Sequence, residues 1–195
     1  MNEGSTDAVA DAVRQFLKAL GVDPAGDPEL RESPERVARA WRDELLGGYA
    51  RDPRSALGEA LDTTERGLVV VTEIRYESVC PHHLMPTWGV AHVGYLPGGR
   101  IVGLGGLVAL VEGYARRLVL QETLGRQVVE ALVESLGARA AGVMLVGRHG
   151  CLSARGERQG GAQVVTQSFA GLWSDDVHSR AEFVLSLQGA LSRRG

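Results

Sequence analysis

The sequence predicts an α+β fold in which helices cover one face of a mostly antiparallel sheet. Two observations indicate this class: valine-rich, strand-like segments come as two pairs, and a long helical segment separates the pairs. A third is the helical periodicity of the N-terminal third of the chain. We therefore divide the chain into a helical N-terminal segment, residues 1–66, and a sheet-containing domain, residues 67–195.

The composition limits the functional classes. With 195 residues, 44% hydrophobic and 23% charged, the chain has the make-up of one globular domain with at most a small appendage. A net charge of −3 argues against a broad nucleic-acid surface. The apolar runs are far shorter than the roughly 20 residues of a membrane-spanning helix, and the acidic, polar N-terminus is unlike a secretion signal. We expect a cytoplasmic protein without nucleic-acid or membrane partners.

Two helices are predicted in the N-terminal segment. Apolar residues recur at three- and four-residue steps from Thr6 to Leu20, which predicts an amphipathic helix that ends at Gly21. A second helix is expected to begin with Ser33 as N-cap and Pro34 in the first turn, and to end at Gly47-Gly48. The stretch that follows, to residue 66, looks irregular, with one short helix near residues 55–61.

The sheet and its covering helices are predicted from the remaining periodicity. The valine, isoleucine and aromatic content of four segments is typical of strands, and the three- to four-residue spacing of leucine and valine in two others is typical of helices. The longer helix leaves room for a break near residues 118–121. Strands are expected at residues 67–78, 87–96, 141–148 and 163–169, and helices at residues 105–136 and 181–191.

Both cysteines of the chain have histidine neighbours. Cys80-Pro81-His82-His83 lies in the connection between the first two predicted strands, and His149-Gly150-Cys151 follows the third. In a reducing compartment, two cysteines so far apart suit metal binding or catalysis better than a disulfide. A cysteine and a histidine three positions apart match the close ligand pair of many zinc sites.

This pattern suggests a catalytic zinc site. Singly, each of these residues would more often be a buried apolar thiol or a hydrogen-bonded imidazole, but their joint occurrence argues for a site. If Cys80, His83 and Cys151 bind one zinc, the fourth position is left to water, which is the catalytic arrangement. His82 and His149 would then be free for acid–base work. A structural zinc module would instead need four protein ligands. The other two histidines are read as structural: His92 and His178.

Further polar residues are candidates for binding a substrate. A carboxylate such as that of Glu122, after Gln121 late in the helical segment, can pair with two adjacent N–H groups of a guanine edge. Guanidinium groups suit phosphate, although each arginine singly is more often a surface charge. The candidate phosphate contacts are Arg36, Arg39 and Arg155.

Together these motifs resemble those of the GTP cyclohydrolase I family, over roughly residues 29–190. The resemblance implies the tunnelling fold (T-fold), in which subunit sheets join into a barrel and two pentameric rings form a homodecamer with active sites at subunit interfaces. It implies Zn²⁺ bound by Cys80, His83 and Cys151, catalysis by His82 and His149, and guanine binding by Glu122 with Gln121. The matching segments are Ser78-Val79-Cys80-Pro81-His82-His83-Leu84, Gly94-Tyr95-Leu96-Pro97, Gly103-Leu104, Arg116-Arg117-Leu118, Gln121-Glu122, His149-Gly150-Cys151 and Arg155-Gly156.

The implied reaction is hydrolytic opening of guanine at C8, release of formate, and closure to 7,8-dihydroneopterin triphosphate. The sequence departs from the family where a serine, a lysine and an arginine usually contact the triphosphate, since Gly105, Gly106 and Ala109 stand there, and Pro81 replaces a glutamate. We therefore keep two alternatives: a paralogue that acts on a guanine nucleotide with fewer phosphates or stops at a ring-opened pyrimidine, and a non-catalytic pterin- or purine-binding protein on the same scaffold.

Overall fold

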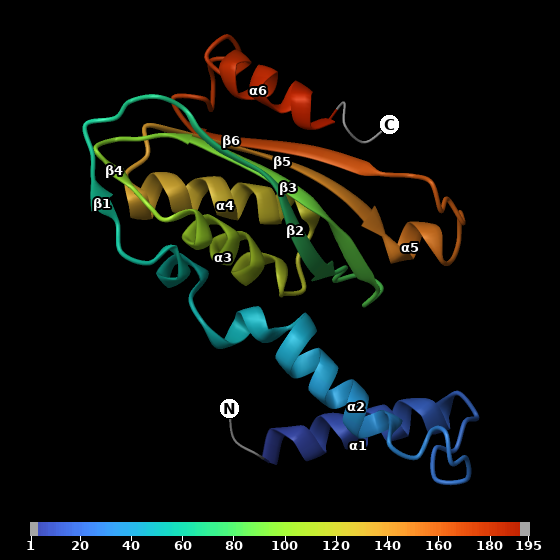
Figure 1. Cartoon of the computed structure of the whole chain (residues 1–195). Helices are drawn as coiled ribbons and strands as arrows, with labels where there is room; N and C mark the ends of the chain where they lie inside the picture. Colours follow the sequence, from blue (N-terminus) through green and yellow to red (C-terminus); the bar gives the residue numbers. More distant parts are fainter. Residues whose placement is uncertain (1–3, 192–195) are drawn as a thin grey trace.

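A computed structural model describes residues 4–191 of the chain, with helices on both faces of a four-stranded sheet (Figure 1). None of the helices in this range is long and apolar enough to span a bilayer. The helices are α1 Gly4–Ala19, α2 Ser33–Arg39, α3 Leu104–Ala115, α4 Gln121–Leu136, α5 Gly150–Ser153 and α6 Ala181–Leu191, with a π-helical turn η1 Ala40–Leu45 and 3-10 turns η2 Gly47–Ala50 and η3 Pro53–Leu57. The strands are β1 Leu61–Asp62, β2 Val69–Val79, β3 Pro86–Leu96, β4 Arg100–Ile101, β5 Ala140–His149 and β6 Val164–Gly171.

The four long strands lie in the order β2-β3-β5-β6, and every pairing is antiparallel, as predicted. Helices α3 and α4 cover one face of this sheet and form the main core with it (Figure 1). Large side chains with less than 2% of their surface exposed fill that core, among them Tyr95, Leu107, Leu110, Leu124 and Leu132. The predicted α+β class and the two covering helices are confirmed.

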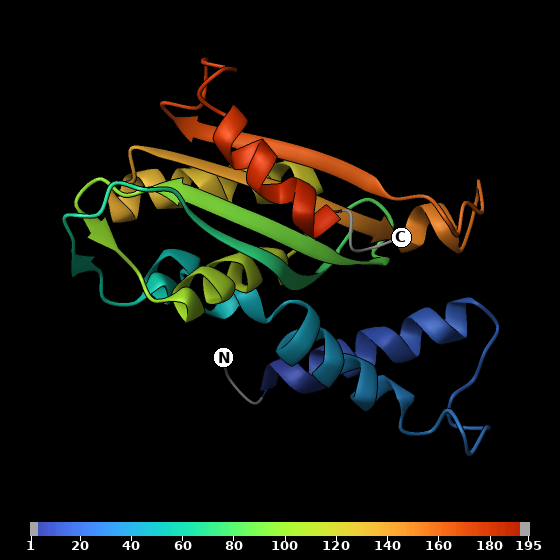
Figure 2. The same cartoon turned by 45° about the horizontal axis from the view of Figure 1, so that its top comes forward.

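The expectation that all helices lie on one face is wrong for α6, which packs on the opposite side of the sheet (Figure 2). Phe183 and Leu187 of α6 are fully buried there, against Val90 and Met144 of the sheet. A Cβ atom at Gly94 would lie 2.6 Å from the Phe183 ring, so the absence of a side chain lets that ring sit directly on β3. Strand β5 is therefore covered on both sides, and eight of its residues in a row are buried.

The long helical segment is broken, as predicted, between α3 and α4. Backbone contacts hold the break against the end of β2: Leu118 forms a bridge with Val79, and the Val119 N–H donates to the Val79 carbonyl at 3.3 Å. This connection places the N-terminus of α4, which begins at Gln121, beside the loop between β2 and β3. The break thus determines which residues face that loop.

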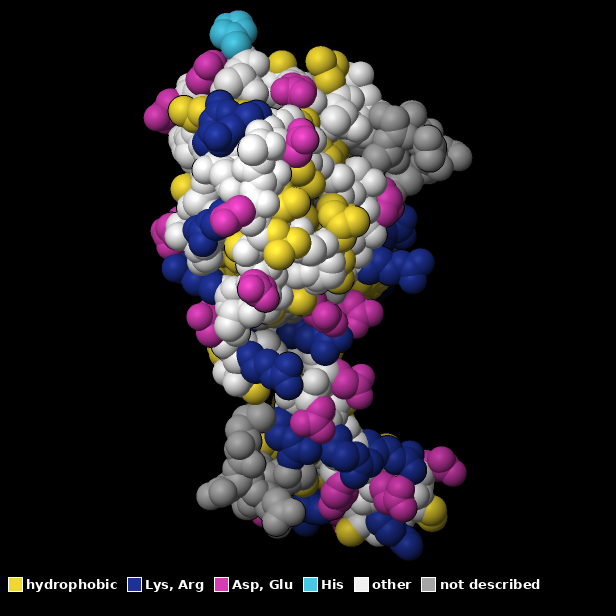
Figure 3. Space-filling view, turned by 60° about the vertical axis from the view of Figure 1, so that its left-hand side comes forward, with side chains coloured by type: hydrophobic (Ala, Val, Ile, Leu, Met, Phe, Trp, Pro, Cys, Tyr) yellow, Lys and Arg dark blue, Asp and Glu magenta, His cyan; other side chains and the backbone are white. Residues whose placement is uncertain are grey.

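Helices α1 and α2 pack on each other at a distance from the sheet (Figures 1 and 2). An ion pair between Arg14 and Glu35 joins them. The N-cap prediction for Ser33 is wrong, since Glu32 occupies the cap position and no side chain caps the helix. Seen from the left-hand side, the helical pair is crowded with charged side chains, whereas hydrophobic side chains gather on the sheet-containing part (Figure 3).

The segment from η2 to η3 packs closely on α3 because several glycines lack a side chain at the contact. A Cβ atom at Gly106 would overlap the Leu57 carbonyl oxygen, and one at Gly113 would lie 3.1 Å from the Pro53 Cβ atom. Gly105, one residue earlier, has nothing within 4 Å of its Cβ position. Two adjacent glycines of the first turn of α3 therefore have opposite surroundings: one is against backbone and the other is open.

This difference gives a stability prediction. Gly106→Ala should lower the free energy of unfolding by about 1–3 kcal/mol, because the Leu57 carbonyl has to move. Gly105→Ala is the matched control and should leave stability unchanged or raise it by up to about 1 kcal/mol, since alanine favours the helix. Urea unfolding of both variants at equal protein concentration measures the difference. Equal effects of the two substitutions would contradict the packing.

Candidate functional site

The two cysteine motifs meet at one end of the sheet. The loop between β2 and β3 is tight: the Cys80 N–H donates to the Met85 carbonyl at 2.9 Å, and the Leu84 N–H donates to the Cys80 carbonyl at 2.9 Å. In the sheet, β5 is the neighbour of β3 and pairs with it so that His149 lies opposite Thr87. Helix α5 begins directly after His149 and carries Cys151 back toward the loop.

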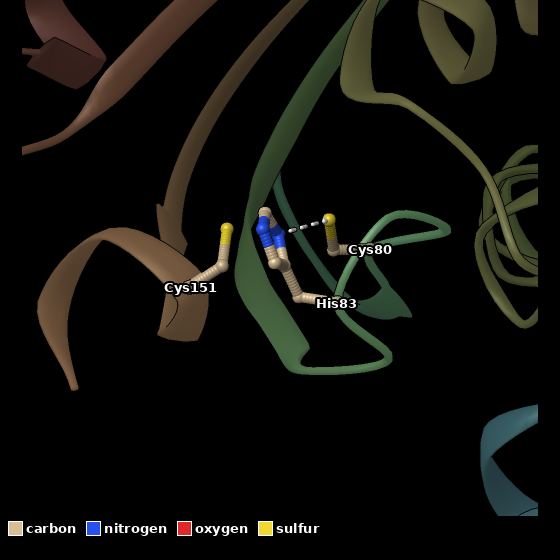
Figure 4. Close-up of side chains that lie close together, drawn as sticks. All are labelled: Cys80, His83 and Cys151. Atoms are coloured by element: carbon tan, nitrogen blue, oxygen red, sulfur yellow. Dashed lines mark hydrogen bonds between the residues drawn. The ribbon is translucent and has the colours of Figure 1, made fainter. Parts of the chain in front are cut away.

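Cys80, His83 and Cys151 point toward one another (Figure 4), and their ligand atoms all lie within 4.8 Å of one another. The Cys80 Sγ to His83 Nδ1 distance is 3.8 Å. Sulfur and nitrogen ligands of a tetrahedral zinc lie roughly 3.6 Å apart, so the group is close to a metal-binding geometry. Two thiols and an imidazole also form a donor set that zinc favours. The three residues can hold a metal ion.

The acidity of Cys151 fits such a site. Burial raises the pKa of the Cys151 thiol above its usual value, and the neighbouring Cys80 sulfur raises it further. Two thiols held side by side resist ionising together. A cation between them would reverse this effect and favour both thiolates. The pair is therefore suited to a bound cation.

A pocket with about 690 Å³ of empty space, open to solvent, adjoins the three residues. His82 and His149 line it together with Gln121 and Glu122, the first two residues of α4. Burial lowers the pKa of His149, while the Glu122 carboxylate partly offsets this by raising it. Among the residues that the structure describes, no group bonds to the buried Nδ1 atom of His149. The pocket thus combines a metal-binding group, two imidazoles and a carboxylate.

The two residues at the start of α4 differ sharply in exposure. Glu122 is exposed and lines the pocket, whereas Gln121 is 5% exposed. The Gln121 Oε1 atom accepts a hydrogen bond from the Tyr76 hydroxyl at 2.9 Å. Its Nε2 atom lies 3.0 Å from the Val164 carbonyl oxygen and 3.0 Å from Thr166 Oγ1. The side chain of Gln121 is therefore committed to protein partners.

The predicted phosphate contacts do not line this pocket in a single chain. Arg155 is exposed on the turn after α5, near enough to Cys151 to lower its pKa slightly. Arg36 and Arg39 lie on α2, where Arg36 pairs with Glu32 at 2.7 Å. Gly105, Gly106 and Ala109 lie on α3 and are also absent from the lining.

Sequence reasoning missed several lining residues, although a signal for some of them exists. Tyr76, Ser78 and Cys80 are spaced two residues apart along β2 and the loop that follows it, so their side chains point to the same face of the sheet. Polar residues at this spacing from a candidate metal ligand could have been recognised as facing the same pocket. The others lie in segments that meet only in the folded chain. The missed lining residues are Tyr76, Ser78, Thr87, Val119, Leu120, Leu124 and Val164.

Comparison with known proteins gives relatives over most of the chain. The chain is 37% identical over 182 residues to "GTP cyclohydrolase 1" of Deinococcus radiodurans, covering 93% of this chain and 83% of the relative. It is 46% identical over 167 residues to "GTP cyclohydrolase 1" of Bifidobacterium longum, covering 85% and 83%. A solved structure, apo archaeosine synthase QueF-Like, gives a TM-score of 0.46 at 21% identity over 55% of this chain and 97% of that one, too slight a likeness to bear on function.

The family comparison extends across the helical segment and the sheet alike. The family model described as GTP cyclohydrolase I matches residues 9–188 of this chain, and this range includes every candidate residue of the pocket. The identities to named relatives cover more than two thirds of both chains. The chain therefore belongs to the GTP cyclohydrolase I family.

Proposed function

We propose that the protein hydrolyses GTP to 7,8-dihydroneopterin triphosphate and formate. The observation that carries this proposal is the convergence of Cys80, His83 and Cys151, from two segments far apart in the sequence, beside a pocket that Glu122 lines. The reaction adds water at C8 of guanine, releases that carbon as formate, and closes the rearranged ribose on the remaining pyrimidine. Each requirement of this chemistry has a candidate group in the pocket.

Cys80, His83 and Cys151 would hold zinc, because their donor atoms and spacing fit it. Bound there, zinc would supply Lewis-acid activation of water near neutral pH. Three protein ligands distinguish such a site from a structural one, which uses four. The described residues offer no fourth cysteine, histidine or carboxylate in this cluster.

The remaining pocket residues divide the work of binding and proton transfer. The Glu122 carboxylate would accept hydrogen bonds from two adjacent N–H groups of guanine, since an ionised carboxylate has two acceptor oxygens. His82 and His149, which both line the pocket, would give a proton to the departing ring nitrogen and move protons during the second C–N cleavage. Imidazole suits both roles because it titrates near neutral pH.

The protein is further proposed to act as a homo-oligomer, a decamer in the family's tunnelling-fold arrangement. Strands β2 and β6 are the two edges of the sheet, and each can pair with a strand of a neighbouring subunit. Arg36, Arg39 and Arg155 do not line the pocket of their own chain, so the two on α2 would contact phosphate from a neighbouring subunit. We also propose the division into residues 1–66 and 67–195, and a cytoplasmic location.

A second candidate function is favoured by the surroundings of Gly106. The Leu57 carbonyl fills the space that a side chain at position 106 would need, so this chain cannot offer a cation there without moving η3. With Gly105 and Ala109 beside it, the first part of α3 has no polar side chain for a triphosphate. A preference for guanine nucleotides with fewer phosphates follows, with the ring-opening residues unchanged.

The adjacent histidines allow a matched test of the metal site. His83→Ala should lower the bound zinc well below one ion per chain and abolish formate release. His82→Ala should keep the zinc and lower kcat by about 10²–10⁴-fold, because it removes a proton-transfer group. Metal analysis and formate release measure the two effects. A His82→Ala variant that loses zinc as fully as His83→Ala would contradict the assignment.

Parallel assays with GTP, GDP, GMP and guanosine test the phosphate preference. We expect kcat/KM for GDP or GMP to lie within about tenfold of that for GTP, because one or two charge-assisted contacts of about 1.5–3 kcal/mol each are missing. The readouts are formate release and the ultraviolet spectrum of the product. A preference for GTP above a thousandfold would exclude the second candidate, and no turnover of any of the four by zinc-loaded protein would favour a pterin- or purine-binding role.

Ala109→Arg is the substitution that tests where the phosphates lie. Ala109 is half-buried beside a second, larger surface pocket and leaves room for a longer side chain. An arginine there should lower the KM for GTP about tenfold or more and leave the KM for guanosine unchanged. Val108→Arg, one position away and exposed, is the control. Equal effects on both substrates would contradict a phosphate contact at this turn of α3.

A further inference from the structure

Both ends of the Gln121 side-chain amide, Oε1 and Nε2, form hydrogen bonds with other groups of the protein. Tyr76 is 3% exposed, and burial raises the pKa of its hydroxyl well above the usual value, so the hydroxyl stays protonated and donates to Oε1. On the other side, Nε2 faces the Val164 carbonyl, the Thr166 hydroxyl and, at 3.3 Å, the Leu145 carbonyl. Carbonyl oxygens only accept, so the amide has a single consistent orientation.

No donor of this amide remains for a ligand. Nε2 carries two hydrogens, and three acceptors lie within 3.3 Å of it. The opposite end is closed as well, because a Cβ atom at Gly147 would overlap Gln121 Oε1. The amide lies directly on the backbone of β5, which only a glycine permits at this point. A purine in the pocket would therefore meet Glu122 and not the Gln121 side chain.

These bonds attach the first turn of α4 to three strands. Gln121 is the first residue of α4, and its partners lie on β2, β5 and β6. Glu122 is the next residue, and it lines the same pocket as His149, which lies at the end of β5. The Gln121 side chain thus holds the carboxylate of the pocket in register with the strand that carries the imidazole.

We infer that Gln121 is a positioning residue, fixed by Tyr76, which sets the place of the base-binding Glu122 and does not itself contact the base. The inference rests on the proposed function in so far as Glu122 binds the guanine edge. It replaces the expectation that Gln121 and Glu122 bind guanine as a pair. Gln121 determines where guanine lies, and Glu122 determines which base is accepted.

The test compares GTP with inosine triphosphate, which lacks the 2-amino group of guanine. Gln121→Met removes the amide at similar length and should raise the KM for GTP about 10- to 100-fold, because a carboxylate displaced by about 1 Å loses its alignment with both N–H groups of guanine. The KM for inosine triphosphate should rise less, because only one of those N–H groups is present there. The ratio of kcat/KM between GTP and inosine triphosphate should therefore fall by threefold or more, whereas loss of a direct contact from the Gln121 amide to an atom that both bases share would leave the ratio unchanged. Glu122→Gln should change that ratio by tenfold or more, since it loses one of the two acceptors.

Three further variants separate positioning from general stability. Tyr76→Phe should raise KM in the same direction as Gln121→Met, and the double variant should add little, because both act on one hydrogen bond. Gln127→Met makes the same substitution six residues further along α4 and should leave KM unchanged. Loss of folded enzyme lowers the apparent kcat alone, so an unchanged KM in Gln121→Met would overturn the inference. A GTP/inosine triphosphate ratio that stays at the wild-type value in Gln121→Met would overturn it too, because the effect would then not pass through Glu122.

Failure of the proposed function has a different signature. If zinc-loaded wild-type protein turns over neither nucleotide, equilibrium dialysis with the same two nucleotides gives their dissociation constants, and the same ratios apply to binding. A larger weakening of GTP binding than of inosine triphosphate binding by Gln121→Met then supports the positioning role although the catalytic proposal has failed. Absence of binding to either nucleotide removes the base site and with it this inference.

Discussion

The pairing of β3 with β5 brings the two cysteine motifs of the pocket together. His149 lies opposite Thr87 at one end of this pairing, so the segment that carries Cys151 begins beside the loop that carries Cys80 and His83. A slip of one residue would move each side chain of β5 to the other face of the sheet. The register is strongly determined because both faces of β5 are buried, one under α3 and α4 and the other under α6. The meeting of Cys80, His83 and Cys151 therefore depends on the core as well as on the loop that carries Cys80 and His83.

Much of this arrangement is predictable from the sequence, because periodicity and turn residues act locally. The four long strands, the break before Gln121 and the meeting of the two cysteine motifs all follow from residue pattern and spacing. The place of α6 does not follow from residue pattern, since a short apolar helix can pack on either side of a sheet. The side is decided by Gly94 and Gly142, whose lack of side chains leaves space for the Phe183 ring. The helix start at Ser33 is likewise decided by packing against α1 rather than by a cap.

The candidate site was predictable in its chemistry and less so in its geometry. Thiol, imidazole and carboxylate side chains can be recognised as candidate site residues from residue type alone, and Cys80, His83 and Glu122 are found in this way. The role of buried polar residues such as Tyr76 and Gln121 cannot be recognised in this way. A glutamine on a helix looks like any other helix residue until its hydrogen-bond partners on three strands are known. The phosphate contacts stay a prediction, since Arg36 and Arg39 lie on a helix away from the pocket of their own chain.

The contact between Gly106 and the Leu57 carbonyl also limits how this sequence can change with time. A lysine at position 106 is incompatible with the present path of η3, so that substitution is harmful until the η3 segment has first shifted. A cation therefore cannot be introduced at position 106 by a single substitution without moving η3. The order of substitutions becomes constrained by packing, and a new polar side chain is accommodated more readily at an open position such as Gly105.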